Sequence, residues 1–177
     1  MQSSFRLSLS TLFLILAVQL AASQTVPLTN PAKGDIPQSA PQHFVCNTGY
    51  SAQQCHEQMS VLRPLLDRYG AGGLGDWTWV LVKSDDWKAL QRQHRMDPDS
   101  PAFTVLDRRE TFFEEALVSP VTTRRVELVR QWSLGMDELL RLAVTHELGH
   151  ALCNEKNERK ADAYGEELRK GQPVQCK

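Results

Sequence analysis

The chain has 177 residues, of which 41% are hydrophobic and 23% are charged, so its composition is that of an ordinary globular protein and excludes a fibrous or wholly disordered one. Its formal net charge of −1 gives no electrostatic basis for binding nucleic acid. The length favours a single folded domain.

The first 23 residues have the pattern of a secretory signal peptide. Arg6 supplies a positive charge, and residues 12–20 form an apolar run. The small residues at 21–23 suit cleavage before Gln24. The apolar run is well short of the roughly 20 residues that a transmembrane helix needs. We therefore expect a secreted protein, extracellular or periplasmic, with no membrane span after cleavage.

The four cysteines are expected to be paired, because an exported chain reaches an oxidising compartment. Four cysteines allow three pairings, and the sequence does not distinguish among them. We favour Cys46 with Cys55, which closes a short loop. The second bridge would then join Cys153 to Cys176 and tie the C-terminal tail to a predicted helix.

Residues 24–42 are rich in Pro, Thr, Ser, Asn and Gln, which predicts a flexible tether ahead of a domain that spans residues 43–177. Within this domain, Ser51 and Gln54 match a capping box, and apolar residues follow at steps of three and four. These features predict a helix over residues 52–69. The glycines within residues 70–75 predict a loop.

The middle of the domain predicts a small sheet and one helix. Residues 77–82 are aromatic and β-branched, which favours a strand, and two acids near the start of residues 84–95 favour a helix. Residues 97–101 suit a turn. Residues 102–106 and 111–118 are two β-like segments that predict a hairpin or two adjacent strands.

Two helices are predicted at the end of the chain. Residues 136–153 carry apolar side chains at steps of three and four. Asn157 can cap a helix over residues 158–170, and Gly171 suits a left-handed stop after it. We therefore expect an α+β fold in which a small β-sheet packs against these two helices.

Residues 146–150 read His-Glu-Leu-Gly-His, a His-Glu-x-x-His motif inside the first of the two helices. Histidines four residues apart project from one helical face, so His146 and His150 can bind one Zn²⁺ per chain. Glu147, beside them, can take a proton from a zinc-activated water and pass it to a leaving amine.

A catalytic zinc with two histidine ligands needs a third protein ligand. If a tight turn joins the two helices, Glu158 lies about one turn beyond His150 and can reach inward. Asp162 then lies nearer to His146, where it can accept a hydrogen bond from the imidazole and orient it. Asp162 itself is the nearest alternative ligand, and Glu155 is a weaker one.

The two motifs resemble those of the gluzincin metallopeptidases, whose His-Glu-x-x-His helix is followed by a helix bearing Glu-x-x-x-Asp. Here residues 158–162 read Glu-Arg-Lys-Ala-Asp, which is also similar to the membrane metallopeptidases that process prenylated proteins. The small ImmA-type peptidases have a comparable helix. The resemblance covers residues 139–170. Only seven residues separate His150 from Glu158, fewer than in thermolysin-like enzymes, and aspzincins use an aspartate as third ligand.

The resemblance implies a zincin-like metallopeptidase domain that hydrolyses peptide or protein substrates. It implies His146, His150 and Glu158 as zinc ligands, Glu147 as the catalytic base, and Asp162 as the partner that orients a ligand imidazole. Zincins also lay an edge strand beside the cleft, against which an extended peptide can add. Residues 111–118 could be that strand or an interior one.

Two other functions remain open at this point. A zincin-like domain without catalysis would be a binding or structural module, and a disulfide-linked export protein would hold no metal. Zinc content and peptide hydrolysis separate the three. The remaining histidines, at 43, 56 and 94, receive no role. We expect core packing rather than carbohydrate binding from Trp77, Trp79 and Trp87.

Overall fold

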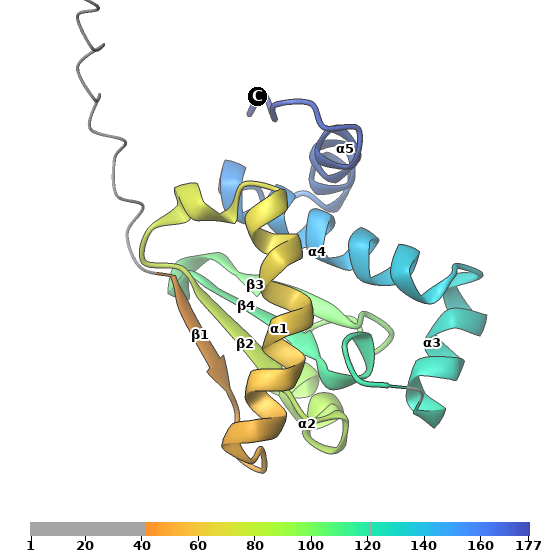
Figure 1. Ribbon diagram of the computed structural model, residues 1–177. Coiled ribbons are helices and arrows are strands. Elements are labelled where there is room, and N and C mark those ends of the chain that lie inside the picture. Colours follow the sequence, from red (N-terminus) through yellow and green to blue (C-terminus); the bar gives the residue numbers. More distant parts are fainter. Residues whose placement is uncertain (1–41, 121) are drawn as a thin grey trace, which may run out of the picture. The chain divides into compact units, whose positions relative to one another are not determined.

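The computed structural model describes residues 42–120 and 122–177 (Figure 1). The expected signal peptide and, apart from Gln42, the expected tether lie outside the described residues. Over the described ranges the fold is α+β, with five α-helices around a mixed four-stranded sheet. None of the helices in these ranges has the length and apolar character to cross a membrane.

The sheet has the order β1-β2-β4-β3. Strands β1, β2 and β4 are parallel, and β3 runs antiparallel to β4 at one edge. The strands are β1 (His43–Cys46), β2 (Thr78–Val82), β3 (Ala102–Val105) and β4 (Glu110–Glu114). Strand β4 lies inside the sheet and passes into the 3₁₀ turn η3 (Glu115–Leu117), so residues 111–118 are not the edge strand. Strand β3, the first strand of the expected hairpin, is instead the edge strand, and it lies on the side of the sheet nearest the last two helices.

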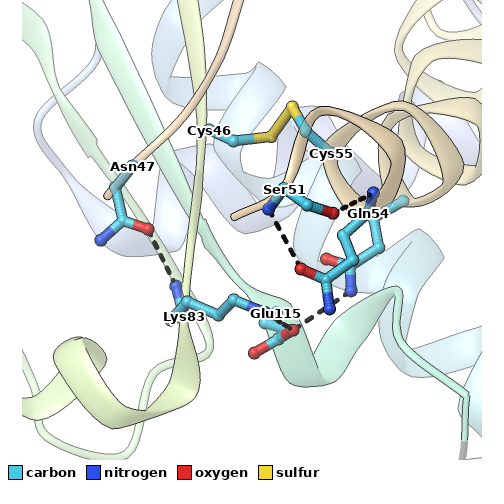
Figure 2. The surroundings of a disulfide bond; sticks show 8 residues. Cys46, Asn47, Ser51, Gln54, Cys55, Lys83 and Glu115 are labelled. Carbon is cyan, nitrogen blue, oxygen red and sulfur yellow. Dashed lines mark hydrogen bonds and ion pairs between the residues drawn. A yellow bond between two sulfur atoms is a disulfide. The ribbon is translucent and has the colours of Figure 1, made fainter. Parts of the chain in front are cut away.

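Helix α1 (Ala52–Arg68) begins at the expected capping box. The Gln54 backbone N–H donates to the Ser51 hydroxyl, and the Ser51 N–H donates to the Gln54 side chain, both at 3.1 Å (Figure 2). The Cys46–Cys55 disulfide joins β1 to the first turn of α1, as favoured from the sequence (Figure 2). The glycine-rich segment that follows is the 3₁₀ turn η1 (Ala71–Leu74).

The two faces of the sheet carry separate apolar clusters. Side chains alternate along a strand, so Phe112 and Phe113 point to opposite faces. Phe112 packs with Trp87 of α2 (Ser84–His94), whereas Phe113 belongs to the larger core beneath α1 and α4. Trp79 lies in that larger core and, like Trp87, is fully buried, which confirms the expected packing role of these tryptophans.

Three further helices complete the fold: α3 (Thr123–Trp132), α4 (Met136–Cys153) and α5 (Glu158–Arg169). Helix α3 was not expected from the sequence. The side chain of Asn157 accepts the Lys160 N–H at 3.2 Å, so the expected cap of α5 is present. Gly171, with φ +71°, provides the left-handed stop.

Helices α4 and α5 pack with their backbones in contact, as Figure 1 shows at the C-terminal end of the molecule. A Cβ atom on Gly149 would lie 2.5 Å from the Ala161 carbonyl oxygen, and one on Gly165 would lie 3.0 Å from the Thr145 backbone. A side chain on Gly149 would therefore force the two backbones apart, and Gly165 leaves only a tight fit for one. This close approach brings the first turn of α5 over the histidines of α4.

Candidate metal centre

The two histidines of the motif and one glutamate of α5 converge on a single point. His146 Nε2 lies 3.1 Å from His150 Nε2 and 3.1 Å from Glu158 Oε2, and the remaining side, from His150 Nε2 to Glu158 Oε2, is 3.4 Å. Zinc bonds of about 2.0–2.1 Å in a tetrahedron separate ligand atoms by about 3.3 Å. The three atoms thus match one face of a zinc coordination tetrahedron.

The other nitrogen of each imidazole is held by an oxygen. His150 Nδ1 lies 2.6 Å from the Glu155 carbonyl oxygen, and His146 Nδ1 lies 2.7 Å from Asp162 Oδ1. Because these oxygens accept, each Nδ1 carries the hydrogen, and in the neutral imidazole the lone pair lies on Nε2. Three electron-rich atoms then converge, and a cation at their centre would satisfy all of them. Two imidazoles and a carboxylate are a donor set that suits zinc.

The three acidic residues that the sequence offered as possible third ligands occupy different positions around the centre. Glu158 and Asp162 are largely exposed, with 74% and 65% of their side chains accessible, so the centre opens to solvent on the α5 side. The Asp162 carboxylate lies against the far nitrogen of His146, Nδ1, and not against the Nε2 atom at the centre. The side chain of Glu155 accepts the Asn157 N–H at 2.9 Å and pairs with a lysine, so it points away from the centre.

Glu147 lies on the side of α4 that faces the sheet, with 3% of its surface exposed. Burial raises its pKa to about 7, whereas the neighbouring His150 and the Thr104 side chain act to lower that pKa. Over the described ranges its Oε2 atom has no hydrogen-bond partner. A carboxyl group that titrates near neutrality beside a metal-binding group has the properties of a general acid–base.

A cleft of about 600 Å³ runs between β3 and α4 and contains the whole constellation. Edge strand β3 forms one wall of the cleft. The backbone N–H and C=O groups on the free side of this strand pair with no other strand of the sheet, and they border the cleft. Its apolar lining includes Met96, Phe103, Val105, Trp132, Leu139 and Leu142. In the part of the chain that the structure describes, no histidine other than those of the motif lines it.

Two features of this centre were missed from the sequence. The Glu155 carbonyl reaches His150 because Asn154 adopts a left-handed conformation, with φ 47°, and turns the chain back at the end of α4. An asparagine just after a helix is a recognised signal for that turn, but a backbone oxygen has no residue type to mark it. Thr104 lines the cleft together with Glu147 and acts to lower the pKa of that carboxyl group, but no motif marks it.

Comparisons of the chain with protein-family models, with curated proteins and with solved structures find no match. Membership of the gluzincins therefore stays a prediction from residues 139–170, and so does a zincin-like fold. The structure itself provides an α+β fold in which His146, His150 and Glu158 form a group that could hold a metal ion, beside the buried Glu147.

Proposed function

We propose that the protein is a secreted zinc metallopeptidase that binds one Zn²⁺ through His146, His150 and Glu158 and hydrolyses peptide bonds with Glu147 as general base. The observation that carries this proposal is the triangle of two imidazole nitrogens and one carboxylate oxygen, with sides of 3.1–3.4 Å, next to a buried glutamate. The proposed fold is zincin-like.

The contacts around the three converging atoms support a preorganised metal site. The Asp162 carboxylate and the Glu155 carbonyl fix the orientation of the two imidazoles, which is the usual arrangement around metal-ligating histidines. A bound Zn²⁺ would supply Lewis acidity, which polarises the substrate carbonyl and lowers the pKa of a nearby water. Glu158, at the start of α5, would complete the protein ligand set and leave the fourth position open.

The residues of the chain perform the proton transfers in this proposal. Glu147 accepts a proton from the attacking water and delivers it to the leaving amine, and a pKa of about 7 suits both steps at neutral pH. Strand β3 offers its free edge to an extended peptide, which would add as a further strand and run along the cleft past the triangle. A strand edge that binds its substrate through backbone hydrogen bonds favours a peptide as that substrate.

Export is the remaining part of the proposal. Both disulfides, Cys46–Cys55 and Cys153–Cys176, are the pair favoured from the sequence, and bridged cysteines persist in oxidising compartments. The described ranges contain no helix suited to cross a membrane. Together with the signal-like N-terminal pattern, these features support an extracellular or periplasmic location.

Elemental analysis and peptide-library cleavage with the exported, oxidised protein test the proposal. We expect one zinc per chain and hydrolysis that Glu147→Gln lowers by about 10²- to 10⁴-fold without loss of zinc, because the amide keeps the shape but accepts no proton. Glu158→Ala should release zinc. Glu166→Gln, on the exposed face of α5, is the matched control and should change neither property.

Two outcomes would contradict the proposal. A wild-type protein that holds zinc but cleaves no peptide would leave a zincin-like binding or structural module. A protein that retains no zinc after export would exclude the metal centre. If Asp162→Ala releases zinc and Glu158→Ala does not, the third ligand is Asp162.

A further inference from the structure

Trp132 is the one tryptophan of the described ranges with a large exposed surface. It is 40% exposed, whereas Trp77, Trp79 and Trp87 are 4% exposed or less. Helix α3 ends at Trp132 because Ser133 adopts a left-handed conformation, with φ 54°, and turns the chain toward α4. The indole lines the cleft between β3 and α4, so its exposed apolar surface is available to a molecule bound there.

Trp132 belongs to the end of the cleft that lies away from the candidate metal centre. Lys156, which follows α4, pairs with Asp107, which follows β3, at 3.8 Å. The two elements therefore end side by side and run in the same direction, and their starts border the other end of the cleft (Figure 1). Leu139, seven residues before His146, lies about 10 Å from it along the helix. That distance equals about three residues of an extended peptide.

This end of the cleft has an apolar wall. Met96 and Phe103 line it from the side of the sheet, and Leu139 and Leu142 line it from α4. Phe103 and Leu139 are buried, whereas Met96, Leu142 and Trp132 keep exposed surface. We call these five residues the distal subsite. A bulky apolar side chain of a bound peptide would cover the exposed part and remove it from water.

Two unpaired carboxylates lie beside the distal subsite. Asp97 and Asp99, in the turn before β3, line the same cleft and are exposed. Over the described ranges, no lysine, arginine or histidine forms an ion pair with either. Glu155, at the metal end, is instead paired with Lys160. The whole cleft is lined by seven acidic residues and one lysine, so it attracts cationic groups and opposes anionic ones.

We propose that the distal subsite and the Asp97–Asp99 pair select peptides with a bulky apolar side chain about three residues from the cleaved bond and a lysine or arginine beyond it. The position of the cleaved bond rests on the proposed function, whereas the binding of a cationic, apolar peptide does not. The edge of β3 would contact only the backbone of a peptide, so these side chains provide the selectivity that the edge lacks.

A peptide library randomised on both sides of the cleaved bond is the first test. Phenylalanine at the selected position should raise kcat/KM about tenfold over alanine, and arginine beyond it about threefold over citrulline. Trp132→Ala should reduce the first preference. The double variant Asp97→Asn, Asp99→Asn should reduce the second, as should salt at about 0.5 M. Val126→Ala on α3 and Asp67→Asn on α1, both exposed and outside the cleft, are the matched controls.

Acrylamide quenching of tryptophan fluorescence tests the distal subsite without turnover. In the Glu147→Gln variant, Trp132 should give the quenchable signal because the other tryptophans are buried. The peptide acetyl-Ala-Ala-Ala-Phe-Arg-Arg-amide, or its reverse sequence, should protect this signal in a saturable way. Alanine in place of phenylalanine should weaken binding about tenfold, and citrulline in place of both arginines several-fold. Adding Trp132→Phe should remove the quenchable signal.

The two tests separate the failure of this inference from the failure of the proposed function. An active wild type without these preferences, or with preferences that Trp132→Ala leaves unchanged, overturns the inference and leaves the proposed function intact. Absence of protection by both peptides also overturns it. If the wild type cleaves no peptide, and the peptides still protect Trp132 more weakly in the double aspartate variant, the proposed function fails and the distal subsite remains a peptide-binding site.

Discussion

Glu114 and Glu147 are both almost completely buried, at 1% and 3% exposed, and burial raises the pKa of each. Their surroundings differ. At the end of β4, Arg124 Nε donates to both carboxylate oxygens of Glu114, at 3.0 and 3.3 Å. Glu147 has no lysine or arginine partner over the described ranges, and its Oε2 is unpaired.

The residues around the two glutamates differ in the same way. Next to Glu114, the Lys83 ammonium pairs with Glu115 at 2.9 Å, and Asn47 accepts the Lys83 backbone N–H at 3.2 Å (Figure 2). Charges at this end of the sheet are thus neutralised within the protein. Beside Glu147, two imidazole nitrogens and one carboxylate oxygen converge and form a group that could hold a metal ion. A buried carboxyl group without a cationic partner, next to converging atoms that could hold a metal ion, is characteristic of a functional site.

The largest expected effect comes from removing the cation of the paired glutamate. Arg124→Met leaves the Glu114 charge buried and unpaired, which should lower the free energy of unfolding by about 3–5 kcal/mol. Urea denaturation measures this loss. Arg130→Met, on the exposed side of the same helix, should cost under about 0.5 kcal/mol. A similarly small loss in Arg124→Met would show that the two glutamates do not differ in this way.

The opposite sign is expected at Glu147. Its pKa is about 7 in the folded protein and about 4.3 in the unfolded chain. Between those values the unfolded chain releases a proton that the folded state keeps, so the metal-free wild type loses stability as pH rises through this window. Glu147→Gln removes that loss and should stabilise the metal-free protein on the order of 2–3 kcal/mol at pH 8, and hardly at pH 4.

Denaturation curves with EDTA at the two pH values check this prediction for Glu147. Glu114→Gln provides the comparison: the pKa of Glu114 is also raised, but Arg124 opposes the rise, so any stabilisation at pH 8 should be smaller than that of Glu147→Gln. An equal effect of Glu147→Gln at pH 4 and pH 8 would contradict the role of ionisation.

A smaller effect is expected at Asp162, which contacts one of the proposed zinc ligands. Asp162→Asn keeps an oxygen for His146 Nδ1 but removes the negative charge, so zinc affinity should fall by about 10- to 100-fold. Competition with a chromophoric chelator measures the affinity. Because Asp162 is exposed, the stability of the metal-free protein should not change. Unchanged zinc affinity would show that its contact with His146 does not tune the site.

The smallest effect concerns the partly exposed pair of Lys83 and Glu115. Hydrogen bonds from Lys83 and Gln58 contribute to a lowered pKa of Glu115, so its stabilisation is present above the unfolded pKa and is lost as pH falls through the lower folded value. Glu115→Gln should cost about 1 kcal/mol at pH 7 and less at pH 3. A cost that does not diminish at pH 3 would assign it to packing instead of charge.

The sequence predicted the helices that carry strong local signals. The capping box at Ser51, the Asn157 cap and the Gly171 stop all depend on neighbouring residues, which a sequence displays directly. Helix α3 was missed because Leu128 is its only fully buried side chain, so its apolar face is narrow. Strand β1 was missed because its four residues directly follow the polar, Pro-rich segment and no turn signal separates the two.

The candidate site divides in the same way between local and distant contacts. The spacing of His146 and His150, and of Glu158 and Asp162, follows from helical geometry, and the structure brings these four side chains together. The placement of Thr104 and Glu147 around one cleft depends instead on packing between distant segments of the chain. No short-range pattern carries that information.

The Cys153–Cys176 bridge has a kinetic consequence for any ion bound between α4 and α5. The bridge spans 23 residues and closes a covalent loop that contains Glu158 and begins three residues after His150. The peptide link already keeps Glu158 close to His150, and the bridge adds a second anchor beyond the other end of α5, which limits how far this helix can swing away from α4. We therefore expect the oxidised protein to release a bound ion more slowly than the reduced one.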